Sequence, residues 1–573
     1  MVSGIELALA AVPLLIAGVL LVGFLWPATR AMPVAWIAAL VVGYFVWDMP
    51  VDWLGAASIV GVMTAIQILW IVFGALLLLY TLMQAGAFDR INQGFAAVSD
   101  DRRVQIVLVG FFLATFIEGS AGFGTPAAVV APLLLGLGFP ALAAVVAALI
   151  GHIIAVTYGA VGTPIIVGIQ DPLASVESTK AAIEASGMTV PEYALQVAAW
   201  AATYHALVGF VMPLFAVGMV VYFFGDPDDR SLAPAWEVAP LALFAGISFA
   251  IPYWLAAWFL GGEFPALIGA MVGGAITISA LRAGYFEPDS EWEFPPREEW
   301  PTHWVGTIEP GGSNAEPDAA PDGGEDISLL SAWTPYIALV VLLVVTRVVD
   351  DIAAFLQRDV FITQWSEIFG TTLSGSVSWA YVPGFWLVVS ALIAIPLFGM
   401  NGDQVKAAWR EAGEKLVAPL IALIFVIAMV QVMLQSGAHP GAPEAGSMIQ
   451  ALATFTADVL GAAYPFVSAL IGALGAAMAG SNTVSNITFG GFQFEAAQAL
   501  GLPTQIIVGA QAVGGAIGNL IAIHNVVAAL ATVGLVGQEG RVMRLNLIPL
   551  LYYSIMVGFL AMLFSYVLFP GLF

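Results

Sequence analysis

The chain has 573 residues, of which 60% are hydrophobic and only 9% charged, with a formal net charge of −24 and no cysteine. A soluble core of ordinary proportions cannot hide so many apolar side chains. The apolar runs that recur along the whole length each predict a membrane span. The lack of cysteine excludes disulfides, thiolate nucleophiles and thiolate metal sites, and no basic footprint for nucleic acid is present. Acidic, lysine-poor solvent faces indicate an extreme halophile.

Hydropathy predicts an all-α polytopic membrane protein with about twelve full transmembrane helices and two re-entrant hairpins. The first apolar run has neither the basic start nor the small-residue cleavage site of a signal peptide, so we expect a retained span. The hairpins, 104–137 and 462–500, are apolar on both arms and are interrupted by a polar, glycine-rich tip. The predicted full spans are 6–27, 33–53, 57–85, 140–170, 197–224, 236–260, 264–281, 330–347, 380–398, 416–436, 503–535 and 547–570.

The distribution of lysine and arginine orients this topology. With both termini outside, only Lys180, Arg347 and Arg358 of the 15 basic residues lie outside. The split requires both hairpins to turn back within the membrane, because a crossing hairpin would exchange the sides of every loop between the two. We therefore expect a multi-pass protein of the cytoplasmic (plasma) membrane. The basic residues assigned to the cytoplasmic side are Arg30, Arg90, Arg102, Arg103, Arg230, Arg282, Arg297, Lys406, Arg410, Lys415, Arg541 and Arg544.

Two halves of the chain, 1–284 and 329–573, have the same order of elements: a span, a hairpin, a Gly-x-Pro sequence and an interrupted span. The proline of Gly-x-Pro precedes Gly151 and Gly514 by the same 11 residues. Because the first unit starts outside and the second starts inside, we predict an inverted-topology repeat, which many secondary transporters use. The corresponding elements are 57–85, 104–137 and 140–170 in the first half and 416–436, 462–500 and 503–535 in the second.

An acidic cytoplasmic linker, 285–328, joins the halves. Its densest part, 287–326, is rich in proline, glycine and acid and poor in aliphatic residues, which predicts a disordered or solvating segment. A second segment outside the spans, 350–380, carries Trp365 and Trp379 and is typical of a membrane interface.

The tip of the first hairpin, 118–126, holds three glycines and a proline within eight residues and cannot remain helical. Such a break survives in a membrane only where protein or a water-filled cavity satisfies the backbone. The helix that restarts after it points N–H groups and its positive dipole end at the tip, where they suit a carboxylate. The candidate substrate-binding residues here are Ser120, Gly122, Gly124 and Thr125.

The tip of the second hairpin, 480–486, is small or polar at six of seven positions between two apolar arms. Its amides and hydroxyls can donate to a carboxylate, accept from a 2-hydroxyl or coordinate a hard cation such as sodium. An isolated turn of this composition would be an ordinary surface turn, but its place inside a hairpin that mirrors the first favours a binding site. The candidate residues are Ser481, Asn482, Thr483, Ser485 and Asn486.

The interrupted spans offer further groups, and each of them could equally form a helix–helix hydrogen bond. They are His152, Tyr158, Thr163 and Pro164 in the first half and Gln511, Asn519, His524 and Asn525 in the second; Thr163, Asn519 and His524 are the candidate substrate contacts among them. An acid within a membrane is costly, so Glu118 beside the first tip is a candidate proton carrier, with a neutral hydrogen-bonded clamp as the alternative. His152 is a second candidate proton-coupling residue.

The sequence contains no metal spacing, phosphate loop or nucleotide fingerprint, so we expect no cofactor and no metal. Residues 119–122 fit poorly to a serine-hydrolase elbow, which needs G-x-S-x-G between a strand and a helix. An inverted pair of breaks is also not what a membrane-embedded enzyme requires. We therefore expect a protein that is not an enzyme, with a channel as the remaining alternative.

At these tips the chain resembles the L-lactate permease family. The matching stretches are Phe116-Ile-Glu-Gly-Ser-Ala-Gly-Phe-Gly-Thr-Pro126 with the following Leu-Gly-Phe-Pro, Gly480-Ser-Asn-Thr-Val-Ser-Asn486 running to Phe489-Gly490, and Gly514-Gly-Ala-Ile-Gly518 followed by Ala531-Thr-Val-Gly-Leu-Val-Gly537. Their order and spacing match over nearly the whole chain. The resemblance implies import of L-lactate and related 2-hydroxymonocarboxylates such as glycolate by proton symport.

The chain departs from that family at one place. Members often carry Gly-Lys-x-x-x-Pro-Gln, whereas here residues 518–524 read Gly-Asn-Leu-Ile-Ala-Ile-His and lack the lysine and the proline. If that lysine balances the charge of the substrate, His152, His524 or a bound sodium ion must do so here. A sodium-coupled mono- or dicarboxylate symporter is therefore the alternative function.

We expect the hairpins and the interrupted spans to form a moving transport unit against a scaffold of the remaining spans. Because each tip faces one side of the membrane and could gate it, an elevator-type motion is the predicted mechanism. The partners expected are a small monocarboxylate, a proton or sodium ion, the lipid bilayer and a second copy of the chain in a homodimer.

Overall fold

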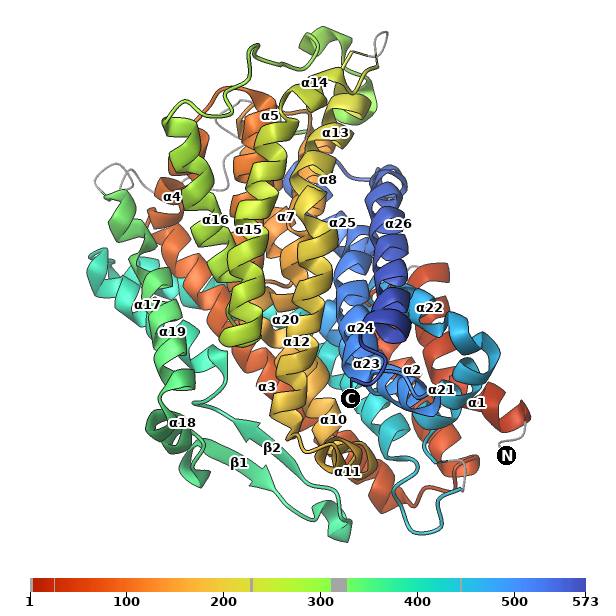
Figure 1. The fold of residues 1–573 in the computed structure, drawn as a ribbon. Helices are drawn as coiled ribbons and strands as arrows, with labels where there is room; N and C mark the ends of the chain where they lie inside the picture. The colour runs from red at the N-terminus through yellow and green to blue at the C-terminus, as the bar shows by residue number, and fades with distance from the viewer. Residues whose placement is uncertain (1–3, 25, 227–229, 311–326, 444–445, 573) are drawn as a thin grey trace.

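The computed structural model describes residues 4–24, 26–226, 230–310, 327–443 and 446–572. Within them, 13 helices are long and apolar enough to cross a membrane, and β1 (Ile362–Trp365) and β2 (Gly375–Ser378) form an antiparallel pair (Figure 1). The prediction of an all-helical polytopic protein is confirmed. Compared with the twelve predicted spans, the 13 include Arg102–Ser120 and Met448–Ala479, which contain the first arms of the two hairpins, and leave out α19 (Pro383–Leu397), which has only 15 residues. Helix α21 (Met448–Leu460), in a stretch without a predicted element, leads directly into the second hairpin.

In the first half, each predicted span outside the broken segments falls on one helix or on two consecutive helices. The helices of the spans predicted at 33–53, 57–85 and 197–224 begin five to seven residues earlier; in the last of these, a capping box at Thr189 starts α12 ahead of the apolar run. The bounds are α1 (Gly4–Gly18), α2 (Ala28–Phe45), α3 (Val51–Gln84), α4 (Ala87–Ala96), α11 (Glu177–Ala185), α12 (Val190–Val208), α13 (Met212–Phe224), α14 (Ala233–Glu237), α15 (Ala239–Phe259) and α16 (Pro265–Arg282).

The first hairpin and the interrupted span after it are broken into short pieces. π-helical turns between α5 and α6 widen the first arm, and a 3₁₀ turn over Ile153–Tyr158 divides the predicted span 140–170. The bounds are α5 (Arg102–Gln105), α6 (Ala114–Ser120), α7 (Thr125–Gly136), α8 (Ala141–Gly151), α9 (Gly159–Ile165) and α10 (Asp171–Ser175).

The second half repeats this order of elements. The predicted span 416–436 is the end of a longer helix, α20, which starts at a capping box on Asn401. A 3₁₀ turn over Asn519–Ile521 divides the predicted span 503–535. The bounds are α17 (Leu329–Val348), α18 (Asp350–Leu356), α19 (Pro383–Leu397), α20 (Gly402–Gln435), α22 (Tyr464–Ala479), α23 (Asn482–Ala499), α24 (Thr504–Gly518), α25 (Ile523–Thr532) and α26 (Glu539–Leu563).

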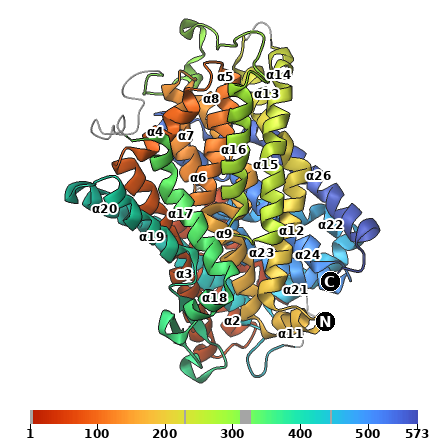
Figure 2. The same ribbon diagram turned by 60° about the vertical axis from the view of Figure 1, so that its left-hand side comes forward.

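Two groups of helices divide the molecule (Figure 2). Helices α3 and α20, each of 34 residues, pack along one another and against α2 and α19. A helix of that length spans about 51 Å, so both must tilt to keep their apolar residues in a hydrocarbon layer of about 30 Å. Helices α22, α23 and α24 form the other group together with α12. We call the group of α2, α3, α17, α19 and α20 the scaffold group.

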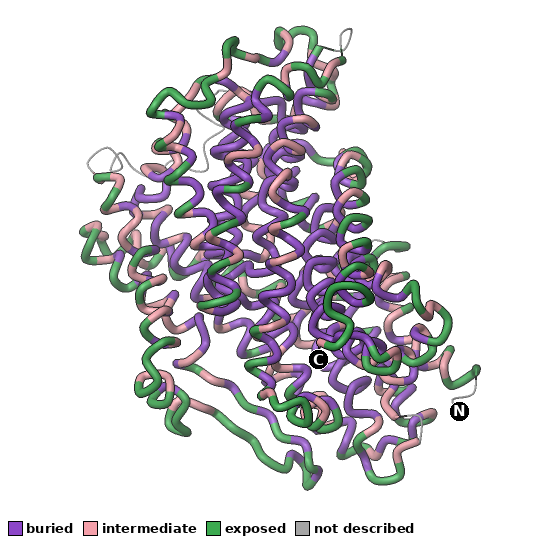
Figure 3. Tube along the Cα trace, viewed as in Figure 1, coloured by how far each residue is buried: buried purple, intermediate pink, exposed green. Residues whose placement is uncertain are grey.

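The broken segments lie in the interior (Figure 3). The most apolar windows of Arg102–Ser120 and Thr504–Ile521 are 100% and 94% buried, whereas that of Gly4–Gly23 is 22% buried and faces the surroundings. Backbone that has left a regular helix needs partners that lipid cannot supply. Burial within protein is therefore what allows these helices to be interrupted at membrane depth.

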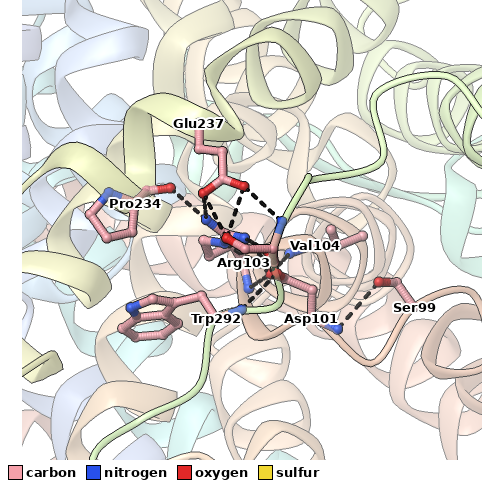
Figure 4. Close-up of polar contacts among 8 residues, drawn as sticks. Ser99, Asp101, Arg103, Val104, Pro234, Glu237 and Trp292 are labelled. Atoms are coloured by element: carbon pink, nitrogen blue, oxygen red, sulfur yellow. Dashed lines mark hydrogen bonds and ion pairs between the residues drawn. The ribbon is translucent and has the colours of Figure 1, made fainter.

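Part of the acidic linker is bound to the first hairpin (Figure 4). The buried Arg103 at the base of the first arm forms an ion pair with Asp101 at 2.7 Å and another with Glu237 at 2.8 Å. It also donates to the Ser290 carbonyl, and the Trp292 N–H donates to Asp101 at 3.0 Å. Further along, linker residues contact α8 and the loop after α25. The prediction of a disordered segment is thus wrong up to residue 310, because aromatic residues and backbone of the linker find partners. Most of residues 285–309 are exposed or half-exposed, as expected for a solvated linker, and residues 311–326 lie outside the described residues.

Candidate substrate site

The backbone of the first hairpin tip is left-handed at three consecutive residues. Helix α6 ends at Ser120 and α7 begins at Thr125, and Gly122, Phe123 and Gly124 between them have φ of 59°, 51° and 81°. Glycine adopts this region freely, so Phe123 is the strained member. No side chain caps α7, which leaves its first N–H groups and its positive dipole end available to a ligand.

The interrupted first span contains a second left-handed stretch, at Ala160, Val161 and Gly162, with φ of 43°, 54° and 77°. A non-glycine residue in this region costs on the order of 1–3 kcal/mol, so the surrounding structure must hold it there. A Cβ on Gly122 would come within 2.9 Å of the Ala160 nitrogen. The two left-handed stretches therefore lie directly against each other.

The second hairpin turns on one left-handed residue, Gly480, with φ of 68°. Ser481 then caps α23 by accepting the Val484 N–H at 3.4 Å. The N–H groups of Asn482 and Thr483 have no acceptor inside the helix, as is general for a first turn. The second tip thus also presents a helix N-terminus, here with polar side chains beside it.

The first turn of α25 contacts both tips. The His524 ring lies over Gly480 and leaves no room for a Cβ there, and Asn525 Oδ1 would meet a Cβ on Gly124 at 2.8 Å. Asn525 also donates to Asn519 Oδ1 at 2.9 Å, across the break between α24 and α25. Two successive residues of α25 therefore each pack against one of the two glycine turns.

These four breaks border one partly open cavity with a mixed polar and apolar lining. It leaves about 30 Å³ for the centres of water molecules, which is room for roughly two of them. In this conformation the space suits a compact solute and is too small for a lipid tail or a peptide. It is lined by Glu118, Gly122, Phe123, Gly124, His152, Val156, Gly159, Ala160, Pro164, Gly480, Ser481, Asn482, Thr483, Asn519 and Asn525.

Glu118 and His152 are the two titratable residues of this lining. The Glu118 carboxylate lies 3.9 Å from His152 Nε2, and His152 Nδ1 donates to the Ala148 carbonyl at 2.7 Å. Because Nδ1 carries that proton, Nε2 of a neutral imidazole is an acceptor aimed at the carboxylate. A single proton can therefore be held between two buried groups that both border the cavity.

The structure brings eight of the fourteen predicted site residues to the cavity: Glu118, Gly122, Gly124, His152, Ser481, Asn482, Thr483 and Asn519. The other six do not line it. Their polar groups hold local structure instead. The hydroxyls of Ser120, Thr125, Thr163 and Ser485 donate to the carbonyls of Ile117, Gly122, Ala160 and Gly472; Asn486 donates to the Pro164 carbonyl; and His524 covers Gly480.

Seven further lining residues are not among these fourteen, although Pro164 and Asn525 are among the groups that the interrupted spans offer. Asn525 and Pro164 belong to the interrupted spans, so the polar break itself was a usable signal for them. Gly480 is the glycine of the second tip. Phe123, Val156, Gly159 and Ala160 are apolar or lack a side chain, and only the left-handed backbone and the 3₁₀ turn bring them to the cavity.

The electrostatics of the cavity favour an anion held by dipoles. None of the lining residues in the described part of the chain is a lysine or an arginine. Positive potential comes from the N-termini of α7, α23 and α25, which begin at or beside the lining. An ionised Glu118 would repel a bound carboxylate across so short a distance. A proton on Glu118 or His152 removes that repulsion.

Many secondary transporters are helical membrane proteins with a cavity between broken helices, and this fold is of that class. The chain is a member of the L-lactate permease family, because the model of that family matches residues 6–568. It is therefore a transporter and not an enzyme.

Several relatives match over most of their length. A protein of Haemophilus influenzae is 28% identical over 554 residues, with 93% of each chain covered. The L-lactate permease of Escherichia coli strain K12 is 26% identical, covering 92% of this chain and 90% of the relative. The glycolate permease GlcA of the same strain is 26% identical, covering 93% and 90%. Among solved structures, the Alcanivorax borkumensis YdaH transporter matches with a TM-score of 0.37 and 15% identity, covering 85% of this chain and 84% of that one.

Proposed function

We propose that this chain imports L-lactate and related 2-hydroxymonocarboxylates such as glycolate, coupled to protons, across the cytoplasmic membrane. The observation that carries the proposal is a buried, partly open cavity at helix N-termini whose lining, among the described residues, has one carboxylate and no lysine or arginine. The names of the relatives, L-lactate permeases and a glycolate permease, support this substrate class.

The substrate carboxylate binds at the first turns of α7 and α23, where unpaired N–H groups and dipole ends meet. The contacting residues are Gly122, Gly124, Ser481, Asn482, Thr483 and Asn519, together with Asn525. Six other predicted residues do not contact the substrate but hold the tips and breaks in shape: Ser120, Thr125, Thr163, Ser485, Asn486 and His524. Of the two histidines that could replace the missing family lysine, His152 is the one that borders the cavity.

The proton binds between Glu118 and His152 and permits the substrate anion to enter. Without it, two carboxylates would share one enclosed space, and a loaded transporter could not close. When the proton is bound, the cavity that holds the substrate anion has the same net charge as the empty cavity without the proton. Coupling follows because the substrate and the proton each lower the free energy of binding of the other.

We expect Glu118→Gln to abolish proton-driven accumulation of lactate, by more than about tenfold, while leaving lactate counterflow exchange intact, because a neutral amide mimics the protonated acid. The matched control is Glu495→Gln in the second hairpin. Glu495 is not in the cavity lining, and it already accepts from Thr179 at 3.2 Å and from Gln450 at 3.3 Å.

Uptake into proteoliposomes under an imposed proton gradient, and separately under a sodium gradient, measures both variants. Full proton-driven uptake by Glu118→Gln would remove Glu118 as the carrier. Uptake by the unmodified protein under the sodium gradient alone would instead establish the sodium-coupled mono- or dicarboxylate symporter, with amide oxygens of the lining as the ion's ligands.

Alternating access is proposed to be an elevator movement of both hairpins and both interrupted spans against the scaffold group. The division into inverted halves 1–284 and 329–573, joined by 285–328, is supported by the pairing of α3 with α20, two equally long helices at equivalent places. Figure 1 also has α5, α14 and the linker at one end and α11, α18 and the sheet at the other, as expected for termini outside and a linker inside.

A crosslink between the two groups tests the movement, and the chain has no cysteine of its own to interfere. Gln435 of the scaffold group donates to the Ser175 carbonyl of α10 at 2.8 Å, so cysteines at both positions should crosslink and stop transport. Cysteines replacing Trp36 and Ser58, which bond within the scaffold group at 3.1 Å, should crosslink without effect. Unimpaired transport in the first pair would contradict the elevator movement.

The proposed transporter is a homodimer. A monomeric mass in mild detergent would contradict this.

A further inference from the structure

Among the residues that line the cavity, Asn482 most clearly lacks a hydrogen-bond partner. Its side chain is buried, lines the space, and has an oxygen without any hydrogen-bond partner among the described residues. The nitrogen of the same amide donates to the Val156 carbonyl at 3.4 Å. The reversed orientation would place two oxygens face to face, so the Val156 carbonyl fixes which end of the amide is free.

The free oxygen lies beside the backbone of Gly515, where a Cβ would overlap it. Gly515 therefore keeps room for this amide without bonding to it. A buried polar atom left unpaired costs free energy, and a native structure retains one where a ligand or water completes it. The oxygen can only accept, so its partner must bring a hydrogen.

The backbone N–H and the side-chain oxygen of Asn482 suit different groups of one small molecule. Its backbone N–H lies in the first turn of α23, where it has no acceptor inside the helix, and suits a carboxylate oxygen. Its side-chain oxygen would repel a carboxylate or a ketone but binds a hydroxyl. A carboxylate and a hydroxyl that both reach one residue must be close together, as they are when the hydroxyl is on carbon 2.

We propose that Asn482 Oδ1 accepts the 2-hydroxyl of the substrate, which makes Asn482 the residue that selects 2-hydroxy acids over unsubstituted and 2-oxo acids. The inference rests on the proposed function, since it assumes a monocarboxylate in this cavity. Propionate lacks the hydrogen and leaves the oxygen unpaired. Pyruvate brings a second acceptor against it.

The unmodified protein gives the first test. In proteoliposomes, unlabelled lactate and glycolate should compete with labelled lactate at least about tenfold better than propionate or pyruvate, the ratio expected for one buried hydrogen bond. Equal competition by propionate would overturn the role of Asn482, whatever the variants do. This measurement does not depend on the folding of any mutant.

The second test is Asn482→Ala, measured as the ratio of lactate to propionate uptake. We expect the ratio to fall to within about threefold of unity while propionate uptake persists. Asn486→Ala is the matched control, because this amide lies one turn further along α23, donates to the Pro164 carbonyl at 3.0 Å and does not line the cavity. Its ratio should equal that of the unmodified protein even if its total uptake falls.

The two hypotheses fail in different ways. No saturable uptake of any monocarboxylate by the unmodified protein would end the proposed function. Uptake of lactate with an unchanged ratio in Asn482→Ala would leave transport standing and overturn the assignment of Asn482. Asn482→Ser, which restores a hydroxyl oxygen to the site, should recover part of the ratio if acceptance of a hydrogen is the cause.

Discussion

The two hairpin tips are equivalent in order along the chain but not in chemistry. The first is built from backbone: three left-handed residues rest on a second left-handed stretch, and the nearby side chains that border the cavity are an acid and a histidine. The second has one left-handed glycine, and its side chains in the cavity lining are two hydroxyls and an amide. On the proposed function, proton chemistry belongs to the first half, and recognition by neutral hydrogen bonds belongs to the second.

In the proposed inverted repeat, this difference indicates what the two halves must share. Both need a helix that stops in the interior and restarts with its N-terminus toward the cavity, because that geometry would supply the proposed anion site. The groups that complete each break are free to differ, since any arrangement that satisfies the backbone is sufficient. A site between two such halves can therefore bind two different ligands, a proton and a carboxylate, at one place.

The largest expected effect comes from Gly480→Ala, which puts a Cβ into the His524 ring at a left-handed position. We expect loss of lactate uptake and a marked fall in the melting temperature of the purified protein. Gly501→Ala is the control: this glycine is equally left-handed, at φ 64°, but a Cβ there meets nothing within 4 Å. It should cost only about 1 kcal/mol.

Because the obstacle at Gly480 is a side chain, the double variant Gly480→Ala with His524→Ala should recover folding and much of the uptake. Removing a side chain cannot rescue the corresponding variant at the first tip, because a Cβ on Gly122 would meet the backbone of Ala160. A double variant no better than Gly480→Ala alone would show that the second tip, too, is limited by its backbone, and the contrast between the tips would fail.

The sequence was sufficient to predict where the helices are interrupted, but not which groups face the cavity at each interruption. Glycine clusters at 119–124 and 514–518, and the polar run 480–486, stand out against apolar surroundings, so both hairpins and the general position of the site could be predicted. Which hydroxyl faces the cavity could not, because Ser485 and Thr163 donate to carbonyls that only the folded chain brings near. Left-handed Ala160 and Val161 carry no sequence signal, since neither residue type favours that conformation.

The bases of the hairpins differ as well, and this predicts a smaller effect. Arg103 at the base of the first arm is fully buried between Asp101 and Glu237, whereas α22 and α23 are joined by neutral groups such as Gln493, which bonds to Tyr464 and Gln511. We expect Asp101→Ala to destabilise the protein by about 3 kcal/mol, because it leaves a buried cation with half its partners. Chemical denaturation followed by tryptophan fluorescence measures this loss.

Glu237→Gln removes the other partner of Arg103 and should cost less than about 1 kcal/mol, because Glu237 is half open to solvent. The hydrogen bond from Arg103 holds the pKa of Glu237 below its usual value. Its contribution is therefore present at neutral pH and disappears as the pH falls through that lowered pKa. The stability of Glu237→Gln should approach that of the unmodified protein in acid, whereas Asp101→Ala, which also loses the cap of α5 and the bond from Trp292, should remain less stable. Equal losses in the two variants at neutral pH would mean that Arg103 is held by charge alone and that burial does not distinguish its partners.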